Sequence, residues 1–114
     1  MSSSGAPKLA IDASGIKITI VAASWHTVIT DGLVAGAERA LKAAGNSDYK
    51  VVRVPGAFEL PLAAQLAIQN GAEVVIALGV VMQGETPHFD YVCEAATSGL
   101  TRVQLDTSVP IGFG

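Results

Sequence analysis

Cysteine and histidine are scarce in this sequence, and their scarcity restricts the chemistry open to it. Cys93 is the only cysteine, which excludes an internal disulfide and suits a reducing cytoplasm. The two histidines, His26 and His88, match no metal-ligand spacing with Cys93. We therefore expect a cytoplasmic protein without a bound metal.

Basic clusters and long apolar runs are missing as well. The net charge is −3, and no run of lysine or arginine occurs, which argues against nucleic acid or an anionic membrane surface as a partner. No apolar stretch approaches the ~20 residues that a membrane-spanning helix needs. The Ser- and Gly-rich start, residues 1–6, lacks the basic and apolar regions of a signal peptide.

What the chain has in quantity is small and β-branched apolar residues. Half of its 114 residues are apolar, and alanine, valine, leucine and isoleucine supply nearly all of that half. This composition suits helices packed on a buried parallel sheet. The length allows one hydrophobic core, so we expect a single domain over residues 1–114, with residues 1–10 as a loose arm.

Apolar periodicity predicts strands that alternate with helices. The predicted strands are 16–23, 50–54 and 74–81, and a further strand opens at Val109. The predicted helices are 31–44, 59–70 and 89–104. Range 74–81 is the most apolar, so we expect it to be the most buried strand. The order βαβαβαβ predicts a three-layer α/β/α sandwich with a parallel, flavodoxin-like sheet and right-handed crossovers.

The loops that follow the strands are the candidate site, because ligands of such sheets bind beyond the carboxyl ends of the strands. The first loop holds Trp25, the only tryptophan, followed by His26. A core position is the alternative for Trp25, but the preceding strand already fills the core. We therefore interpret the indole as a platform for a planar heterocycle. His26 is interpreted as a solvated or supporting histidine.

The second loop, residues 55–61, has a stiff backbone, since it contains two prolines and a glycine. Glu59 falls at the start of the next helix, where an acid favours the helix dipole. The stiff frame also suits another role, in which the backbone and the Glu59 carboxylate hold a polyhydroxylated chain. Both interpretations stay open on this loop alone.

The third loop, residues 79–90, carries the strongest signal. A strand runs into a Gly-containing turn and then a Thr-Pro helix start, where free N–H groups bind anions and Thr86 adds a hydroxyl. Phosphate binding is favoured, provided that the Glu85 side chain points away. His88 follows one helical step later, and histidine transfers protons near neutrality. A bond to a carbonyl or to Asp90 is its alternative role, and catalysis is the favoured one.

Taken together, the three loops resemble the 6,7-dimethyl-8-ribityllumazine synthase family of riboflavin biosynthesis. The segments that carry the resemblance are A-A-S-W-H at 22–26, P-G-A-F-E-L-P at 55–61 and G-V-V-M-Q-G-E-T-P-H-F-D-Y at 79–91. Their register holds from about residue 12 to residue 114. Flavodoxin-like proteins share the layout but not these three loops in this order.

The resemblance implies a role for individual residues. Trp25 stacks on a uracil-type ring, and His88 is the catalytic histidine. The residues implied to hold the ribityl chain and read the pyrimidine edge are Ala57, Phe58, Glu59, Val80, Val81 and Met82. Glu85 and Thr86 lie beside the substrate phosphate, and Gly84 allows its close approach.

The resemblance also implies assembly and a reaction. Phe113 reaches into a neighbouring subunit's site, within a pentamer or a larger shell of pentamers, and riboflavin synthase is a candidate partner. The enzyme condenses 5-amino-6-(D-ribitylamino)uracil with 3,4-dihydroxy-2-butanone 4-phosphate, and no step needs a metal, a redox cofactor or a covalent enzyme intermediate. The alternatives are a flavin- or lumazine-binding module without catalysis, and a shell-forming scaffold.

Two departures from the family pattern bear on these expectations. Gln83 stands where members commonly have a basic residue. The family's phosphate-binding arginine and two further helices lie beyond the position that matches Gly114. We therefore expect further residues or a second chain to complete the domain, and we do not expect residues 1–114 alone to form a stable, active monomer.

Overall fold

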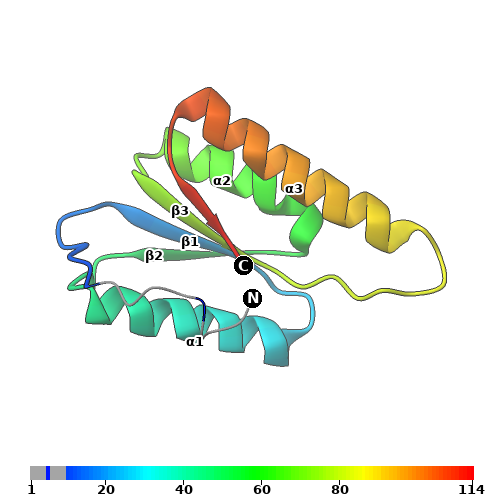
Figure 1. The fold of residues 1–114 in the computed structure, drawn as a ribbon, viewed down its shortest axis with the longest axis horizontal. Coiled ribbons are helices and arrows are strands. Elements are labelled where there is room, and N and C mark those ends of the chain that lie inside the picture. The colour runs from blue at the N-terminus through cyan, green and yellow to red at the C-terminus, as the bar shows by residue number, and fades with distance from the viewer. Residues whose placement is uncertain (1–4, 6–9) are drawn as a thin grey trace.

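In the computed structural model the protein is described at Gly5 and over residues 10–114. Residues 1–4 and 6–9, which include most of the predicted arm, lie outside the described residues. Figure 1 follows the elements along the chain. They are β1 (Ile18–Ala23), α1 (Thr27–Ala43), β2 (Lys50–Val54), the short 3-10 helix η2 (Ala57–Glu59), α2 (Leu60–Gln69), β3 (Val74–Leu78), α3 (His88–Thr107) and β4 (Ile111–Phe113).

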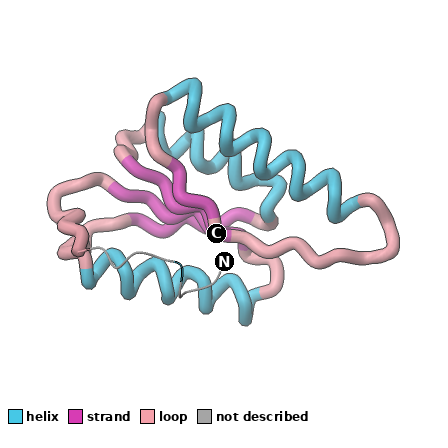
Figure 2. Tube along the Cα trace, viewed as in Figure 1, coloured by secondary structure: helices cyan, strands magenta, loops and turns pink. Residues whose placement is uncertain are grey.

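The strands form one parallel sheet in the order β2-β1-β3-β4. At its centre, Val21 of β1 is in register with Val52 of β2 and Ala77 of β3. Helix α1 lies on one face of the sheet, and α2 and α3 lie on the other (Figure 2). The predicted three-layer α/β/α sandwich with a flavodoxin-like parallel sheet is therefore confirmed.

Strand β1 is the most buried strand, since all six of its residues are buried. Its side chains alternate between the two faces, so that Ile20 joins the core under α1 and Val21 joins the core under α2 and α3. The prediction that 74–81 is the most buried strand is wrong. Strand β3 ends at Leu78, and its Ile76 is only half-buried. Both strands lie inside the sheet, but β1 has neighbours along its length in β2 and β3, whereas β3 is covered on its other side only by the three-residue β4.

Helix α1 begins earlier than the predicted range 31–44. The carbonyl oxygen of His26 accepts hydrogen bonds from the N–H groups of Ile29 (3.0 Å) and Thr30 (3.1 Å), which closes the first turn at once. Thr30 is fully buried. The helix therefore starts at Thr27, directly after the Trp25 loop.

Helix α3 runs past its predicted range 89–104 to Thr107, and β4 begins at Ile111 rather than at Val109. The Val109 N–H donates to the Thr107 hydroxyl at 3.3 Å, so the chain is still turning at that point.

Among the helices of the described residues, none is both long and apolar enough to cross a membrane.

A close approach between α3 and α2 positions the second loop. A Cβ atom on Gly99 would lie 2.6 Å from Cγ of Pro61, so only glycine allows α3 to pack directly on the first turn of α2. Figure 1 shows the two helices side by side on this face. The packing fixes the start of α2, and with it Glu59, against the sheet.

Candidate active site

The loops after β1 and β2 are joined by backbone hydrogen bonds that continue the sheet beyond both strands. The N–H groups of Ser24 and Trp25 donate to the carbonyl oxygens of Val54 (2.7 Å) and Pro55 (3.0 Å). The third loop leaves β3 next to the first two loops. At its first residue, Gly79, an added Cβ would lie 3.1 Å from Leu60 Cδ1 and 3.7 Å from Ala23 Cβ. The ends of β1, β2 and β3 therefore form one continuous edge, at the point where α1 and α3 depart to opposite faces.

Each strand is followed or ended by one large apolar side chain that stays exposed. The exposed fractions are 60% for Trp25 after β1, 63% for Phe58 after β2, 54% for Met82 after β3 and 60% for Phe113 in β4. Large apolar side chains gathered on one surface mark a ligand or partner site. All four were predicted to be site residues, and the fold leaves all four at the carboxyl edge.

Trp25 lies in a turn of unusual backbone geometry. His26, the next residue, has φ 58° and ψ 67°, a left-handed conformation that residues with a Cβ rarely adopt. The indole is 60% exposed, so the alternative that Trp25 is a core residue is wrong. The turn holds a flat aromatic surface open to solvent beside the second loop.

In the second loop, one carboxylate oxygen of Glu59 is buried without a hydrogen-bond donor from the described residues. Ala57 is buried and starts η2, while Glu59 ends it at the N-terminus of α2. Glu59 Oε2 is inaccessible to solvent, and among the described residues no group donates a hydrogen bond to it. A Cβ on Gly56 would lie 3.8 Å from this oxygen. Buried acceptors are normally paired, so Glu59 Oε2 is available to a hydroxyl or N–H group from a ligand.

The third loop has no helix or strand over residues 79–84 and bends at 85–87, and it runs outward from the sheet edge before it returns as α3 (Figure 1). Val80 and Val81 are half-buried, and Val81 packs on the core under α2 and α3, which anchors the start of the loop. These residues were expected at the end of a strand. They lie beyond it instead, since β3 ends at Leu78. Gly84, Glu85 and Thr86 are exposed at the outer part of the loop.

His88 is the first residue of α3 and is exposed. Its backbone N–H points to the Thr86 hydroxyl oxygen at 3.4 Å, a long contact at the upper limit of hydrogen bonding. Among the described residues, no side chain or carbonyl is hydrogen-bonded to the His88 imidazole, so the alternative of a bond to Asp90 is not seen. The imidazole and the N–H groups of Phe89 and Asp90 have no hydrogen-bond partner among the described residues and are free to meet a ligand.

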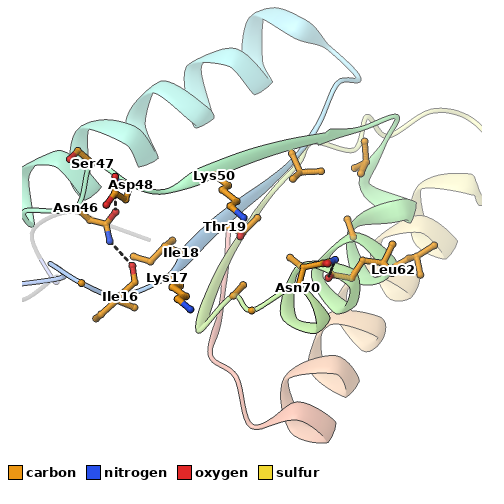
Figure 3. A pocket seen from close by; sticks show the side chains of 18 of the residues that line it. Ile16, Lys17, Ile18, Thr19, Asn46, Ser47, Asp48, Lys50, Leu62 and Asn70 are labelled. Carbon is orange, nitrogen blue, oxygen red and sulfur yellow. Dashed lines mark hydrogen bonds between the residues drawn. The ribbon is translucent and has the colours of Figure 1, made fainter.

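A cavity lies next to this edge rather than in it. It has a volume of about 740 Å³ and is lined by residues of β1, β2 and α2 and of the loop after α1. Figure 3 shows Thr19 and Lys50 on its strand side and Leu62 and Asn70 on its α2 side. Glu59 lines one end of it, whereas Trp25 and His88 do not line it. Sequence patterns did not predict this cavity, although exposed leucines four residues apart on α2, such as Leu62 and Leu66, were a signal for it.

Metal ligands do not gather at this edge. Over the part of the chain that is described, no group of three or more His, Cys, Asp or Glu side chains could hold a metal ion. The groups that the edge offers to a ligand are an aromatic face, a carboxylate, an imidazole and backbone N–H groups.

Known proteins share this sequence over nearly all of its length. The family model for 6,7-dimethyl-8-ribityllumazine synthase matches residues 15–114. The chain is 57% identical over 114 residues to the 6,7-dimethyl-8-ribityllumazine synthase of Kineococcus radiotolerans, covering 100% of this chain and 71% of that protein. It is 56% identical over 116 residues to the synthase of Leifsonia xyli subsp. xyli, covering 100% of this chain and 73% of that protein. The synthase of Streptomyces avermitilis is 49% identical over 115 residues, with 100% and 71% covered. The chain therefore belongs to the 6,7-dimethyl-8-ribityllumazine synthase family.

Proposed function

We propose that this protein is a lumazine synthase of riboflavin biosynthesis, a cytoplasmic transferase. It condenses 5-amino-6-(D-ribitylamino)uracil with 3,4-dihydroxy-2-butanone 4-phosphate to give 6,7-dimethyl-8-ribityllumazine. The observation that carries the proposal is that the loops of the family motifs emerge along one edge of the sheet, each with exposed or unpaired groups. The relatives that share the chain's sequence at 57% and 56% identity support the same reaction.

The pyrimidine substrate is assigned to the first two loops. Its flat ring stacks on the indole of Trp25, which is exposed to solvent. Its ribityl hydroxyl groups donate to Glu59, whose Oε2 has no donor among the described residues. The backbone of residues 80–82, which lies outside any strand, is available to the edge of the ring.

The butanone phosphate is assigned to the start of α3. The first N–H groups of the helix and the Thr86 hydroxyl supply donors to the phosphate, and Gly84 leaves room for its approach. His88 lies in the same helical turn and shuttles protons. The ring amine attacks the ketone and loses water to give an imine, phosphate is eliminated, and ring closure with a second loss of water completes the lumazine. Much of the rate comes from holding both substrates together, with effective molarities of ~10⁵ M or more.

We further propose that the enzyme is a homo-oligomer, a pentamer or a shell of pentamers, with active sites shared between subunits. Phe113 is 60% exposed on the edge strand β4, where it is available to a neighbouring subunit's site. The other outer strand of the sheet, β2, borders the cavity between β2 and α2. Exposed apolar groups beside both outer strands support a head-to-tail contact that repeats around a ring.

The proposal is tested with the full natural polypeptide that contains this sequence. Lumazine absorbance and released phosphate are recorded together after the two substrates are mixed. We expect both products to form in equal amounts, and neither to form when one substrate is left out. Binding of the lumazine without any turnover would contradict the enzyme and support a binding module.

A further inference from the structure

Arg53 of β2 joins the three elements that meet behind the Trp25 turn. One guanidinium nitrogen, Nη1, donates to the carbonyl oxygen of Ala23 at 3.2 Å, and Ala23 is the last residue of β1. The other, Nη2, donates to Asp31 Oδ1 of α1 at 2.5 Å. The Arg53 side chain is 34% exposed, so it is partly screened from water. A single side chain thus ties the residue before the Trp25 turn to the helix that follows the turn.

The other end of the turn is held from α1. The His26 carbonyl oxygen accepts from the Thr30 N–H at 3.1 Å and from the Thr30 hydroxyl at 3.2 Å. The residue held at this end is His26, with φ 58°. A left-handed conformation in a residue with a Cβ persists only when the surrounding structure enforces it.

Packing does little to hold the indole, since Trp25 is 60% exposed. Its orientation therefore depends on the backbone of the turn. The N–H groups of Ser24 and Trp25 hold that backbone to the second loop, and the side chains of Arg53 and Thr30 anchor its two ends. Thr30 is buried inside α1 and belongs to the core. Arg53 is the anchor that lies outside the core, and its removal leaves the core intact.

We propose that Arg53, held by Asp31, is a positioning residue that keeps the Trp25 turn in the orientation that stacks on substrate. A guanidinium suits this role because its planar fork donates to two acceptors at once in a fixed geometry. A lysine ammonium has no such fork and holds one acceptor at a time with less directional control. The identity of the stacked ligand rests on the proposed function, whereas the immobilisation of Trp25 does not.

The alternative is that Arg53 and Asp31 form only a surface ion pair. The chain offers a matched control for this alternative in Arg102, whose Nε lies 3.5 Å from Asp106 Oδ2 on α3 with both side chains largely exposed. Arg102→Gln removes the same charge and an ion pair of the same kind at a distance from the turn. Isolated surface pairs contribute little to stability, so neither variant should unfold the protein.

The test measures the time-resolved fluorescence anisotropy of Trp25, which is the only tryptophan in this sequence. We expect faster local rotation of the indole in Arg53→Gln, an intermediate rate in Arg53→Lys and in Asp31→Asn, and no change in Arg102→Gln. Any tryptophan elsewhere in the natural polypeptide is first replaced by phenylalanine. Wild-type anisotropy in Arg53→Gln would overturn the proposal. Should that variant lose its fold by circular dichroism, wild-type anisotropy in Asp31→Asn would overturn it instead.

Kinetics give the second readout. Arg53→Gln should raise KM for the ribitylaminouracil about fivefold while leaving KM for the butanone phosphate and kcat nearly unchanged, because only the orientation of the stacking surface is lost. Equal losses for both substrates would contradict a role at Trp25. A wild-type protein that forms no lumazine would refute the proposed function, and the anisotropy series would still decide whether Arg53 holds the turn.

Discussion

Single residues at the carboxyl edge of the sheet leave apolar surface in contact with water or a buried hydrogen-bond acceptor without a donor. Trp25 and Phe58 are 60% and 63% exposed, and the Glu59 Oε2 atom is enclosed without a donor. Exposed aromatic rings and an unpaired buried acceptor each raise the free energy of the empty protein. A ligand with a flat ring and a hydroxylated chain satisfies both kinds of group together.

Replacement of Trp25 tests the aromatic half of this arrangement. Trp25→Ala should weaken binding of the ribitylaminouracil by about 1–3 kcal/mol, because stacking on the indole is lost. Binding of the butanone phosphate should change little. Isothermal titration with each ligand separates the two effects, and Trp25→Tyr should retain part of the affinity. Equal affinity for the pyrimidine in the wild type and in Trp25→Ala would show that the ring has no part in binding.

Replacement of Glu59 tests the polar half. Glu59→Gln should weaken binding of the ribityl-bearing substrate by about 1.5–3 kcal/mol, since a hydrogen bond to a charged acceptor is lost. An analogue without the hydroxylated chain should be affected much less. Competition binding with both ligands gives the comparison. Equal losses for the two ligands would instead support a helix-dipole role for Glu59.

At the scale of elements, sequence periodicity predicted β1 to β4 and α1 to α3, because each apolar face is continuous along its own segment, but it did not predict the short η2. The ends were harder to predict, since they depend on tertiary hydrogen bonds. The first turn of α1 is closed by hydrogen bonds to the carbonyl oxygen of the left-handed His26, and β3 ends at Leu78, before the predicted end at residue 81. Periodicity along the sequence determines neither end.

The same limit applied to the site. Trp25, Glu59 and His88 were predicted from the sequence because each follows a strand within a distinctive motif. The role proposed for Arg53 was not predicted, since its two acceptors, Ala23 and Asp31, are distant in sequence and come together only in the folded sheet. A pattern along the sequence does not predict hydrogen-bond partners that are brought together only by the fold.

One contact between elements leads to a pH prediction. The Tyr49 hydroxyl, just before β2, donates to Glu38 of α1 at 2.5 Å, and this hydrogen bond raises the pKa of Tyr49 above 10.0. The bond requires a protonated phenol. Its stabilisation is therefore fully present below the ordinary value of 10.0 and is lost as the pH rises through the raised pKa.

Ultraviolet titration in a Tyr91→Phe background checks this prediction, because Tyr49 is then the only tyrosine of this sequence. The midpoint should lie above 10.0, and Glu38→Gln should move it toward 10.0. A midpoint that is the same with and without Glu38 would contradict the contact.

At the scale of the whole molecule, apolar side chains are exposed at both edges of the sheet. Strand β2 exposes Val51 and Val52 at 41% and 43%, and α2 beside it exposes Leu62 at 60%. At the other edge, Phe113 of β4 is equally exposed. Exposed apolar edges are sites of association. Two different edges per subunit suit a closed ring, in which each site receives a residue from its neighbour.

Complementation between variants tests the shared site. His88→Asn subunits and Phe113→Ala subunits, co-expressed with different tags and purified as mixed oligomers, should be more active than the mean of the two parent oligomers. In random mixtures about a quarter of the sites receive an intact His88 and an intact Phe113. Activity equal to the mean of the parents would show that each subunit supplies its own Phe113, or that Phe113 has no role.

In the proposed function, one edge of the sheet binds the pyrimidine on Trp25 and transfers protons through His88. Single-turnover stopped flow measures both at once, with Trp25 fluorescence reporting binding and lumazine absorbance reporting chemistry. In His88→Asn we expect unchanged quenching by the ribitylaminouracil and lumazine formation slower by about 10²-fold or more. His26→Asn is the control, since asparagine tolerates the left-handed conformation at that position, and it should affect the rate far less. Lumazine formation at the wild-type rate in His88→Asn would contradict the account.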